Sequence, residues 1–430
     1  MSPMPEIRGW CPTAYRPMES GDGLLIRAKT IGPRIDAIRL NAIAHIAKSY
    51  GNGLIDLTQR AQLQIRGVQQ STLKDALDAL DAAGLLPANA DVERITNILA
   101  PPLAGLDSTS AFDASALVTD LAAALAQDVA LYALPAKFLF AVTDDGALPI
   151  DASEADISFH PAAERRIALR LAGVDDAAVI VAPGEAVAAA LRLAKAFIEL
   201  RAASPFDLRR MRKLIAATGV APVIARAGVT LSAVPPLMAN RPSNHLGVQD
   251  LNEIIFAGVS APSGRWRAQE LAILAEAAAA HGLGEVRLTP WRAILIPAPH
   301  RDAAAKIITQ AAASGLIVAS DDPRRSIVAC PGAPECLQAQ GETRIHLERL
   351  APLARQYAGK DGIGLHISGC GKGCARQGAT PITLVLADGH FNLVVNGGAQ
   401  DTPISAGLAL DEIEPSLTHN VRNMAPCAAN

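Results

Sequence analysis

The chain has 430 residues, enough for two or three domains that each bury a core. Half of its residues are apolar and 19% are charged, which is ordinary for a globular protein. The formal net charge of −3 and the lack of a basic run argue against a protein that binds nucleic acid through bulk charge.

No stretch of the sequence has the composition of a targeting or membrane segment. The first residues contain no apolar run as long as a secretory signal, and the Ala-rich stretches at 115–127 and 185–200 are charged or too short to cross a bilayer. We therefore expect a cytoplasmic protein with no membrane partner. In that reducing compartment, the six cysteines are more often thiols or metal ligands than disulfides.

The first predicted elements are a strand at 23–29, an amphipathic helix at 35–53 that ends in glycine, and a strand–turn–strand unit at 53–68. A segment with the sequence NILAPPLAG follows at 97–105. Residues 147–240 are rich in alanine, and their pattern predicts mainly helices.

The same order of elements returns in the second half of the chain. A strand is predicted at 254–260, a helix at 268–284 and a strand–turn–strand unit at 284–297, with Thr289 placed 231 positions after Thr58. Two later pairs of segments repeat as well. They are NILAPPLAG with IVACPGAPE, at an offset of 229, and LPAKFLFAVTDDG with LHISGCGKGCARQG, at an offset of 231.

These matches predict an internally duplicated α+β fold with two halves related by a pseudo-two-fold axis and a site between them. The alternative is generic α/β patterning in an Ala-rich chain.

Four cysteines fall in two loops rich in glycine and proline. The first is a C-x5-C loop and the second a C-x3-C loop, each directly after a β-like run. A cubane cluster needs four thiolates from different directions and close backbone N–H groups, which Gly369, Gly371 and Gly373 would permit. We therefore predict a [4Fe–4S] cluster held by Cys330, Cys336, Cys370 and Cys374.

Three other interpretations of these cysteines compete with the cluster. Structural zinc suits the second loop, but the five-residue spacing of the first loop fits it poorly. Disulfides conflict with the expected compartment, and unrelated core thiols would not normally share two such loops. The remaining cysteines, Cys11 and Cys427, lie outside the pattern and receive no role. The helix after the first loop is expected to begin near Cys336.

The cysteine spacing after a duplicated fold resembles the sulfite/nitrite reductase superfamily. Within it, RGWCPTAYRPMESGDGLLIRAK (8–29) and LTQRAQLQIRG (57–67) are similar to the precorrin-3B synthases of aerobic cobalamin biosynthesis. The likeness covers nearly the whole chain and is weakest at 147–235. It implies two halves, each with a ferredoxin-like half-domain followed by a larger α/β domain. The implied ranges are 8–80 and 90–235 in the first half, and 241–315 and 320–430 in the second.

The resemblance also implies an activity. Members of this family are oxygenases that use O2 and NADH-derived electrons to hydroxylate precorrin-3A at C20, with closure of a γ-lactone. A mononuclear non-haem iron belongs to the family's description, and its ligands are not identifiable in the sequence. The substrate is expected where a reductase holds sirohaem. No dinucleotide-binding fingerprint is present, so we expect electrons to come from a separate reductase. By analogy with the family, the chain is expected to be a monomer.

The chain departs from the reductases at two places. Their LPRKFK-like run is here LPAKFLF, which keeps Lys137 but puts Ala136 and Leu139 where basic residues would stand. The loss of two cations disfavours a small oxyanion as substrate. In the second cysteine loop, Lys372 stands where reductases often carry Asn, and it could pair with a tetrapyrrole carboxylate or face solvent.

The alternating residues of 60–66 would point to one side of a strand, and arginine offers bidentate hydrogen bonds to the carboxylates of precorrin-3A. The alternative is a solvated polar face. The predicted substrate-binding residues are Arg60, Gln62, Gln64, Arg66, Lys137 and Arg376. No catalytic residue is assigned, but the candidates are Lys372, His366 and Asn97, of which Asn97 could equally serve as a turn or cap residue.

Two other functions stay open at this point. One is a sirohaem-dependent sulfite or nitrite reductase with the same fold. The other is a non-catalytic subunit that carries a cluster for electron transfer.

Overall fold

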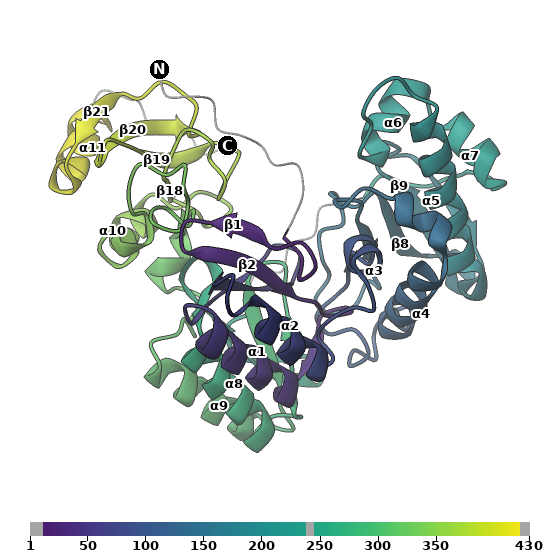
Figure 1. The fold of residues 1–430 in the computed structure, drawn as a ribbon, viewed down its shortest axis with the longest axis horizontal. Helices are drawn as coiled ribbons and strands as arrows, with labels where there is room; N and C mark the ends of the chain where they lie inside the picture. The colour runs from purple at the N-terminus through teal and green to yellow at the C-terminus, as the bar shows by residue number, and fades with distance from the viewer. Residues whose placement is uncertain (1–11, 238–244, 422–430) are drawn as a thin grey trace.

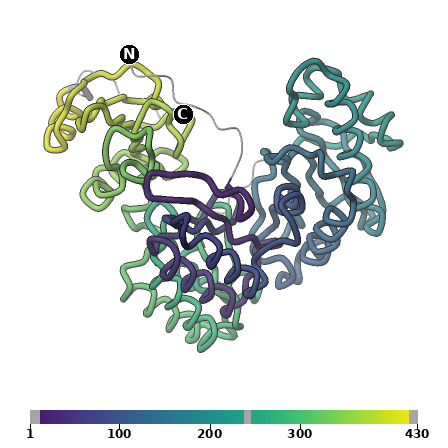
Figure 2. The backbone as a smooth tube through the Cα atoms, in the orientation of Figure 1, coloured from purple at the N-terminus to yellow at the C-terminus, as the bar shows by residue number. Residues whose placement is uncertain are grey.

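The computed structural model describes residues 12–237 and 245–421, and both Cys11 and Cys427 lie outside them. The described residues form four β-sheets, two in a central body and one in each of two lobes (Figure 1). Figure 2 traces the chain from the central body into the lobe of α3 to α7, back into the body and on to the last lobe. None of the described helices is long and apolar enough to cross a membrane.

The central body contains the two ferredoxin-like halves. Sheet 1 has the order β1 (Met18–Ser20), β2 (Gly23–Ala28), β5 (Leu63–Val68), β4 (Leu54–Leu57) and β14 (Arg265–Arg267). Sheet 2 has the order β12 (Gly247–Leu251), β13 (Ile254–Ser260), β16 (Ala293–Pro297), β15 (Glu285–Leu288) and β3 (Arg34–Asp36). The accompanying helices are α1 (Ala37–Tyr50), α2 (Leu73–Ala82), α8 (Ala268–Ala280) and α9 (Arg301–Ala313).

Each half completes its sheet with a strand from the other half. β14 of the second half pairs antiparallel with β4 of the first, and β3 of the first half pairs antiparallel with β15 of the second. The two exchanged strands begin at Arg34 and Arg265, which are 231 positions apart. The turns repeat too, because Thr58 and Thr289 each accept a hydrogen bond at Oγ1 from the backbone four residues later. These relations confirm the predicted duplicated α+β fold.

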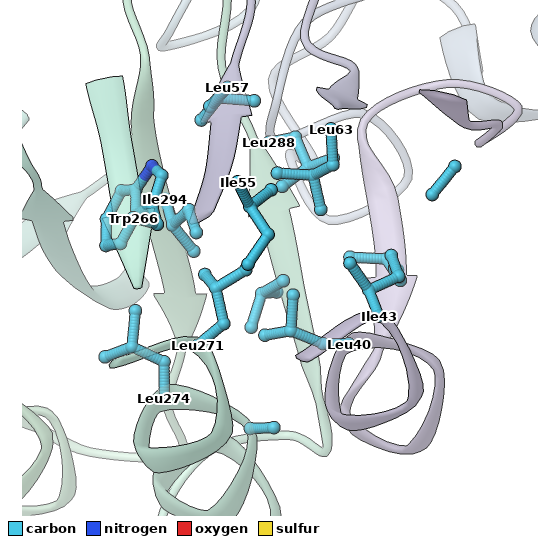
Figure 3. Packing of buried hydrophobic residues seen from close by; sticks show 14 of the residues in the cluster. Leu40, Ile43, Ile55, Leu57, Leu63, Trp266, Leu271, Leu274, Leu288 and Ile294 are labelled. Carbon is cyan, nitrogen blue, oxygen red and sulfur yellow. The ribbon is translucent and has the colours of Figure 1, made fainter. Parts of the chain in front are cut away.

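The two halves share one hydrophobic core. Apolar residues at helical spacing on α1 and α8 meet the inward faces of both sheets, and the buried cluster draws on both halves. Figure 3 shows Leu40 of α1 and Leu271 of α8 close to Ile55 of β4, with Trp266 of the exchanged strand β14 beside Ile294. Trp266 is fully buried, so the exchanged strand is fixed by packing as well as by its ladder.

The first lobe follows the first half. Its sheet has the order β11 (Ser232–Ala233), β10 (Ala177–Val181), β9 (Arg166–Leu171), β8 (Ile157–Ala162), β7 (Phe140–Val142) and β6 (Ile98–Leu99). Its helices are α3 (Ala90–Ile95), α4 (Ala114–Gln127), α5 (Ala186–Ala202), α6 (Met211–Thr218) and α7 (Ala221–Ala227). The prediction that 147–240 is mainly helical is wrong for its first part, because short apolar runs such as AAVIV form strands there.

The last lobe repeats the topology of the first. Its sheet runs β17 (Ile327–Ala329), β18 (Leu365–Ser368), β19 (Thr380–Ala387), β20 (His390–Gly397) and β21 (Ser405–Leu408), with helices α10 (Leu347–Gln356) and α11 (Ile413–Val421). In both lobes two parallel pairings are followed by antiparallel ones. The helix predicted to begin near Cys336 begins at Leu347, after a loop and a short 3-10 turn.

Strand pairing corrects one of the predicted repeats. Ile98 pairs with Phe140 in the first lobe, and Ile327 pairs with Leu365 in the last. The offset of 229 between the isoleucines therefore stands, whereas Phe140 and Leu365 are 225 positions apart. The predicted offset of 231 for that segment was wrong because the connections before β7 and β18 differ in length.

Candidate iron–sulfur and substrate site

The two cysteine loops leave neighbouring parallel strands at the same edge of the sheet. β17 leads directly to Cys330 and β18 leads, through Gly369, to Cys370. The backbone N–H of Cys330 donates to the carbonyl oxygen of Ile367 at 3.2 Å, so the ladder continues to the first cysteine. Because the carboxyl ends of parallel strands share one edge, two loops that begin 40 positions apart, at Cys330 and Cys370, can face a common ligand there.

Cys330 is the most buried of the four thiols, and Cys374 is exposed. Burial raises the pKa of the Cys330 thiol, while backbone N–H groups of Gly369 and Gly332 at its sulfur act in the opposite direction. The N–H of Gly369 lies 3.1 Å from Sγ of Cys330. Hydrogen bonds of this kind to cluster sulfurs are a feature of iron–sulfur sites.

The four thiols are mutual neighbours. Although Cys374 is exposed as a residue, partial desolvation of its thiol raises the pKa; the charge of Lys372 lowers it, and the other three cysteines raise it. A Cβ on Gly369 would lie 2.7 Å from Cβ of Ala339, so a larger residue would push the two cysteine loops apart. The described cysteines form no disulfide.

Within 12–237 and 245–421, no three His, Cys, Asp or Glu side chains stand close enough to hold one ion. A cubane spreads its thiolates over four iron atoms, so its cysteines lie further apart than those of a tetrahedral zinc site. Four thiols on two neighbouring loops are a set of ligands that a cubane cluster could use.

His366 lies beside this site, and neither of its ring nitrogens has a hydrogen-bond partner among the residues that the structure describes. It is fully buried on β18, and its Cε1 would be 3.8 Å from a Cβ on Gly373 in the second cysteine loop. Burial lowers the pKa of His366 to about 4, with a smaller contribution from Arg376, so its imidazole is neutral at pH 7. Two unsatisfied buried nitrogens indicate a missing polar partner at this position.

The structure corrects the prediction that Arg60, Gln62, Gln64 and Arg66 line one side of a strand. β5 begins at Leu63, and residues 58–62 form the turn before it, with Ala61 at a φ of 51°. In that turn, Gln62 hydrogen-bonds to Thr30, while Nη2 of Arg60 donates to the carbonyl oxygen of Lys137 at 3.2 Å. Arg60 thus ties the turn to the loop before β7.

Sheet 1 has a polar face opposite its core. Ile26, Ile55, Leu63, Ile65 and Trp266 point into the core, so the residues between them point away from it. The outward residues, called here the polar face, are Arg27, Asp56, Gln64, Arg66 and Arg265. Arg66 is 3% exposed and pairs with Asp22 and Asp56, so its guanidinium is committed to the chain rather than to a substrate.

Arg27 is a candidate that sequence reasoning missed. It stands opposite Gln64 on the neighbouring strand and is only 4% exposed. Among the described residues its Nε has no hydrogen-bond partner, and the salt bridges found there do not include Arg27. An uncompensated buried cation is costly, which indicates an anionic ligand at the polar face. The sequence feature that could have identified it is a single cation at an outward position of the otherwise apolar strand LLIRA.

The other predicted residues have partners of their own. The amide of Asn97 donates to the carbonyl oxygens of Arg94, Ala136 and Phe138, which is a structural role rather than a catalytic one. Arg376 pairs with Asp361 at 2.7 Å. Lys137 is half-buried and contributes its carbonyl oxygen to Arg60, and Lys372 lies in the second cysteine loop next to Cys374.

In the segment LPAKFLF, Ala136 and Leu139 stand where the resemblance implied basic residues. Leu139 is 5% exposed and packs in the shared core, and its N–H donates to the carboxylate of Asp156 at 2.9 Å. A lysine at this position would bury its charge among apolar side chains. The local structure is therefore built for an uncharged residue.

The chain is similar to proteins of two activities. The family model described as the nitrite/sulfite reductase ferredoxin-like half domain matches residues 16–83 and 249–314. A precorrin-3B synthase from a Sinorhizobium species is 30% identical over 409 residues, covering 92% of this chain and 84% of that protein. A ferredoxin–nitrite reductase from Synechococcus elongatus is 27% identical, covering 88% and 79% respectively.

One solved structure is similar over most of the chain. The Mycobacterium tuberculosis NirA protein matches with a TM-score of 0.71 at 20% sequence identity, covering 95% of this chain and 82% of that one. At that identity the match shows that the two proteins share a fold.

Proposed function

This chain belongs to the sulfite/nitrite reductase superfamily, and within it we propose that it is a precorrin-3B synthase. The proposed reaction is an O2-dependent hydroxylation of precorrin-3A at C20, with closure of a γ-lactone by the ring-A acetate. One oxygen atom of O2 enters the product, and two electrons and two protons reduce the other to water. The electrons would come from NADH through a separate reductase.

The observation that carries this choice is the apolar segment at Leu139. A reductase must hold a small oxyanion, and charge-assisted hydrogen bonds are the means of doing so. This chain has Ala136 and Leu139 in place of two of those cations, and Leu139 is packed in the core. Similarity to a precorrin-3B synthase over 92% of the chain also supports the proposed synthase activity.

The polar groups of the chain suit a tetrapyrrole that carries several carboxylates. Arg27 provides a buried cation whose Nε has no partner among the described residues, and Gln64 stands opposite it on the neighbouring strand. Arg60, in the turn before β5, provides a second guanidinium near the loop at Lys137. Together they would fix the macrocycle by its rim and so orient the C20 edge.

Four cysteines would hold the [4Fe–4S] cluster: Cys330, Cys336, Cys370 and Cys374. When bound, such a cluster supplies electrons one at a time. His366, neutral and buried beside the second cysteine loop, would donate one ring N–H toward the cluster and satisfy a nitrogen that otherwise has no partner. No role is assigned to a mononuclear iron.

The test is a single-turnover reaction. Purified protein with a full complement of iron and sulfide is reduced, mixed with precorrin-3A and exposed to isotopically labelled O2. We expect a product heavier by one labelled oxygen atom, detected by mass spectrometry. No labelled product from a protein that holds its cluster and binds precorrin-3A would refute the proposal.

A sirohaem-dependent nitrite or sulfite reductase is the second candidate, because a nitrite reductase is 27% identical over a similar share of the chain. The visible spectrum separates the two. Sirohaem gives intense Soret-type and red bands, whereas a cluster alone gives a broad shoulder. Sirohaem bands together with reduction of nitrite or sulfite by a strong artificial donor would favour the reductase.

A further inference from the structure

A buried ionic network connects the polar face of sheet 1 to the first cysteine loop. Its members, called here the Asp56 network, are Asp22, Asp56, Arg66, Arg265, Glu335 and Arg344. Every one of these side chains is at most 15% exposed. Ion pairs this deep are weakly screened and depend on all partners being present.

Asp56 is the centre of the network. Its carboxylate accepts from Arg66 at 3.1 Å, from Arg265 at 3.0 Å and from Arg344 at 3.0 Å. Although burial acts to raise it, these guanidinium groups hold the pKa of Asp56 well below its usual range, so the carboxylate stays ionised. One side chain of the first half therefore gathers cations from both halves.

Two members reach the cysteine loop itself. Nε of Arg344 donates to the carbonyl oxygen of Cys330 at 3.3 Å, and Thr343 donates to the same oxygen at 2.6 Å. Glu335, directly before Cys336, accepts a hydrogen bond from Arg265 of the exchanged strand. Its backbone is held too, because the N–H of Gly21 donates to the carbonyl oxygen of Glu335 at 3.0 Å.

The six charges of the Asp56 network sum to zero, with three carboxylates against three guanidinium groups. Loss of one acid would leave the network with one positive charge, and loss of one arginine would leave one negative charge. Reduction adds one negative charge to a neighbouring cluster. A network with an extra positive charge therefore favours reduction, and one with an extra negative charge opposes it. If the network only stabilised the fold, loss of an acid and loss of an arginine would not shift the reduction potential of the cluster in opposite directions.

We propose that the Asp56 network positions the C-x5-C loop and sets the reduction potential of the cluster by its charge balance. Glu335 and Arg344 act on the cluster through Cys336 and Cys330, and Asp56 acts through Arg344. This inference rests on the cluster proposed above and adds the residues that tune it.

The other strand exchange offers a matched control. Glu285 of β15 pairs there with Arg34 of β3 and with Arg287, and Arg287 donates to the carbonyl oxygen of Ala104 at 2.7 Å. That network touches the corresponding loop of the first lobe, where Pro101 and Asp145 stand in place of Cys330 and Cys370. Glu285→Gln thus removes a similar buried carboxylate at a cysteine-free loop.

The experiment is a mediated redox titration of the purified holoprotein, followed by electron paramagnetic resonance of the reduced cluster. Glu335→Gln should shift the midpoint potential upward and Arg344→Gln downward. Each shift should correspond to about a tenfold change in the reduction equilibrium, which is about 59 mV for a one-electron couple. The double variant should return toward the wild-type value, and Glu285→Gln should leave it unchanged.

The outcomes are distinct. Shifts of the same sign, or no shift in variants that keep wild-type iron, would overturn the proposal. Loss of iron from Glu335→Gln or Arg344→Gln, with iron retained in Glu285→Gln, would support the positioning role. A wild-type protein that incorporates no iron and sulfide would instead refute the cluster assignment on which the inference rests.

Discussion

Replacing Arg27 with methionine should separate substrate binding from folding. The arginine is 4% exposed and unpaired in the described chain, so the free protein bears the cost of a buried cation. Methionine keeps most of the apolar stem and removes the charge. We expect the free energy of unfolding of Arg27→Met to stay within about 1 kcal/mol of the wild type or to rise.

Substrate binding should change in the opposite direction. A charge-assisted hydrogen bond to a carboxylate contributes about 1.5–3 kcal/mol, and about 1.4 kcal/mol is a factor of ten in affinity. Arg27→Met should therefore bind precorrin-3A roughly ten- to a hundredfold more weakly, with its cluster content unchanged. Anaerobic titration of the reduced protein measures binding without turnover, and denaturant unfolding measures stability.

Arg66 is the matched control, because it is as buried as Arg27 but is paired with Asp22 and Asp56. Arg66→Met removes the arginine partner of buried Asp22 and one of the three arginines at Asp56, and it should cost about 3–5 kcal/mol of stability. If Arg27→Met were destabilised as strongly while binding substrate normally, the guanidinium would have a structural role and the reasoning would be wrong.

Three further predictions concern the cluster, Arg60 and a histidine of the first lobe. Arg60→Lys keeps the charge but loses the planar fork, so precorrin-3A should bind about ten- to a hundredfold more weakly, and Arg60→Ala weaker still; normal affinity in both variants would exclude a contact. Burial, aided by Arg170, lowers the pKa of His160 to about 4. The unfolded state, with a His pKa near 6.5, then binds more protons, so stability should fall by roughly 3 kcal/mol between pH 6.5 and 4. His160→Gln should flatten that dependence, and an unchanged pH profile in unfolding experiments would contradict it. Serine at any cluster cysteine should abolish the iron and sulfide content, whereas Cys427→Ser should not; four iron atoms surviving in a cluster variant would refute the ligand set of Cys330, Cys336, Cys370 and Cys374.

The duplicated fold could be predicted because its signals are local. The turns at Thr58 and Thr289 follow from short stretches of sequence, and their common offset reveals the repeat. The strands at 157–181 were missed because alanine is compatible with both kinds of element and only pairing in a sheet decided between them. The offset of the last repeat was misplaced for a related reason, since loop lengths are free to differ between halves.

The site residues, too, could be predicted where the signal is local but not where it depends on contacts between distant segments. The cysteine spacing lies within two loops, so the sequence alone indicates the four ligands. The partners of Arg66 are Asp22, in the turn between β1 and β2, and Asp56 of β4. Glu335 pairs with Arg265 of the exchanged strand β14, and Arg344 pairs with Asp56 of the first half. No sequence pattern places such residues together. Arg60 and Gln62 were put on a strand because alternation continues into the turn, where Ala61 adopts a left-handed conformation.

The exchange of β3 and β14 has a consequence for how the protein is made. Sheet 1 lacks its fifth strand until the ribosome has passed Arg267, about 200 residues after β4 has emerged. At roughly 5–20 residues per second, β4 is an open edge for about 10–40 s. Sheet 2 has no such delay, because β3 is synthesised before the rest of it. Edge-to-edge aggregation is thus most favoured during synthesis, while β4 waits for β14. In that time the lobe of 90–233 can fold from its own strands.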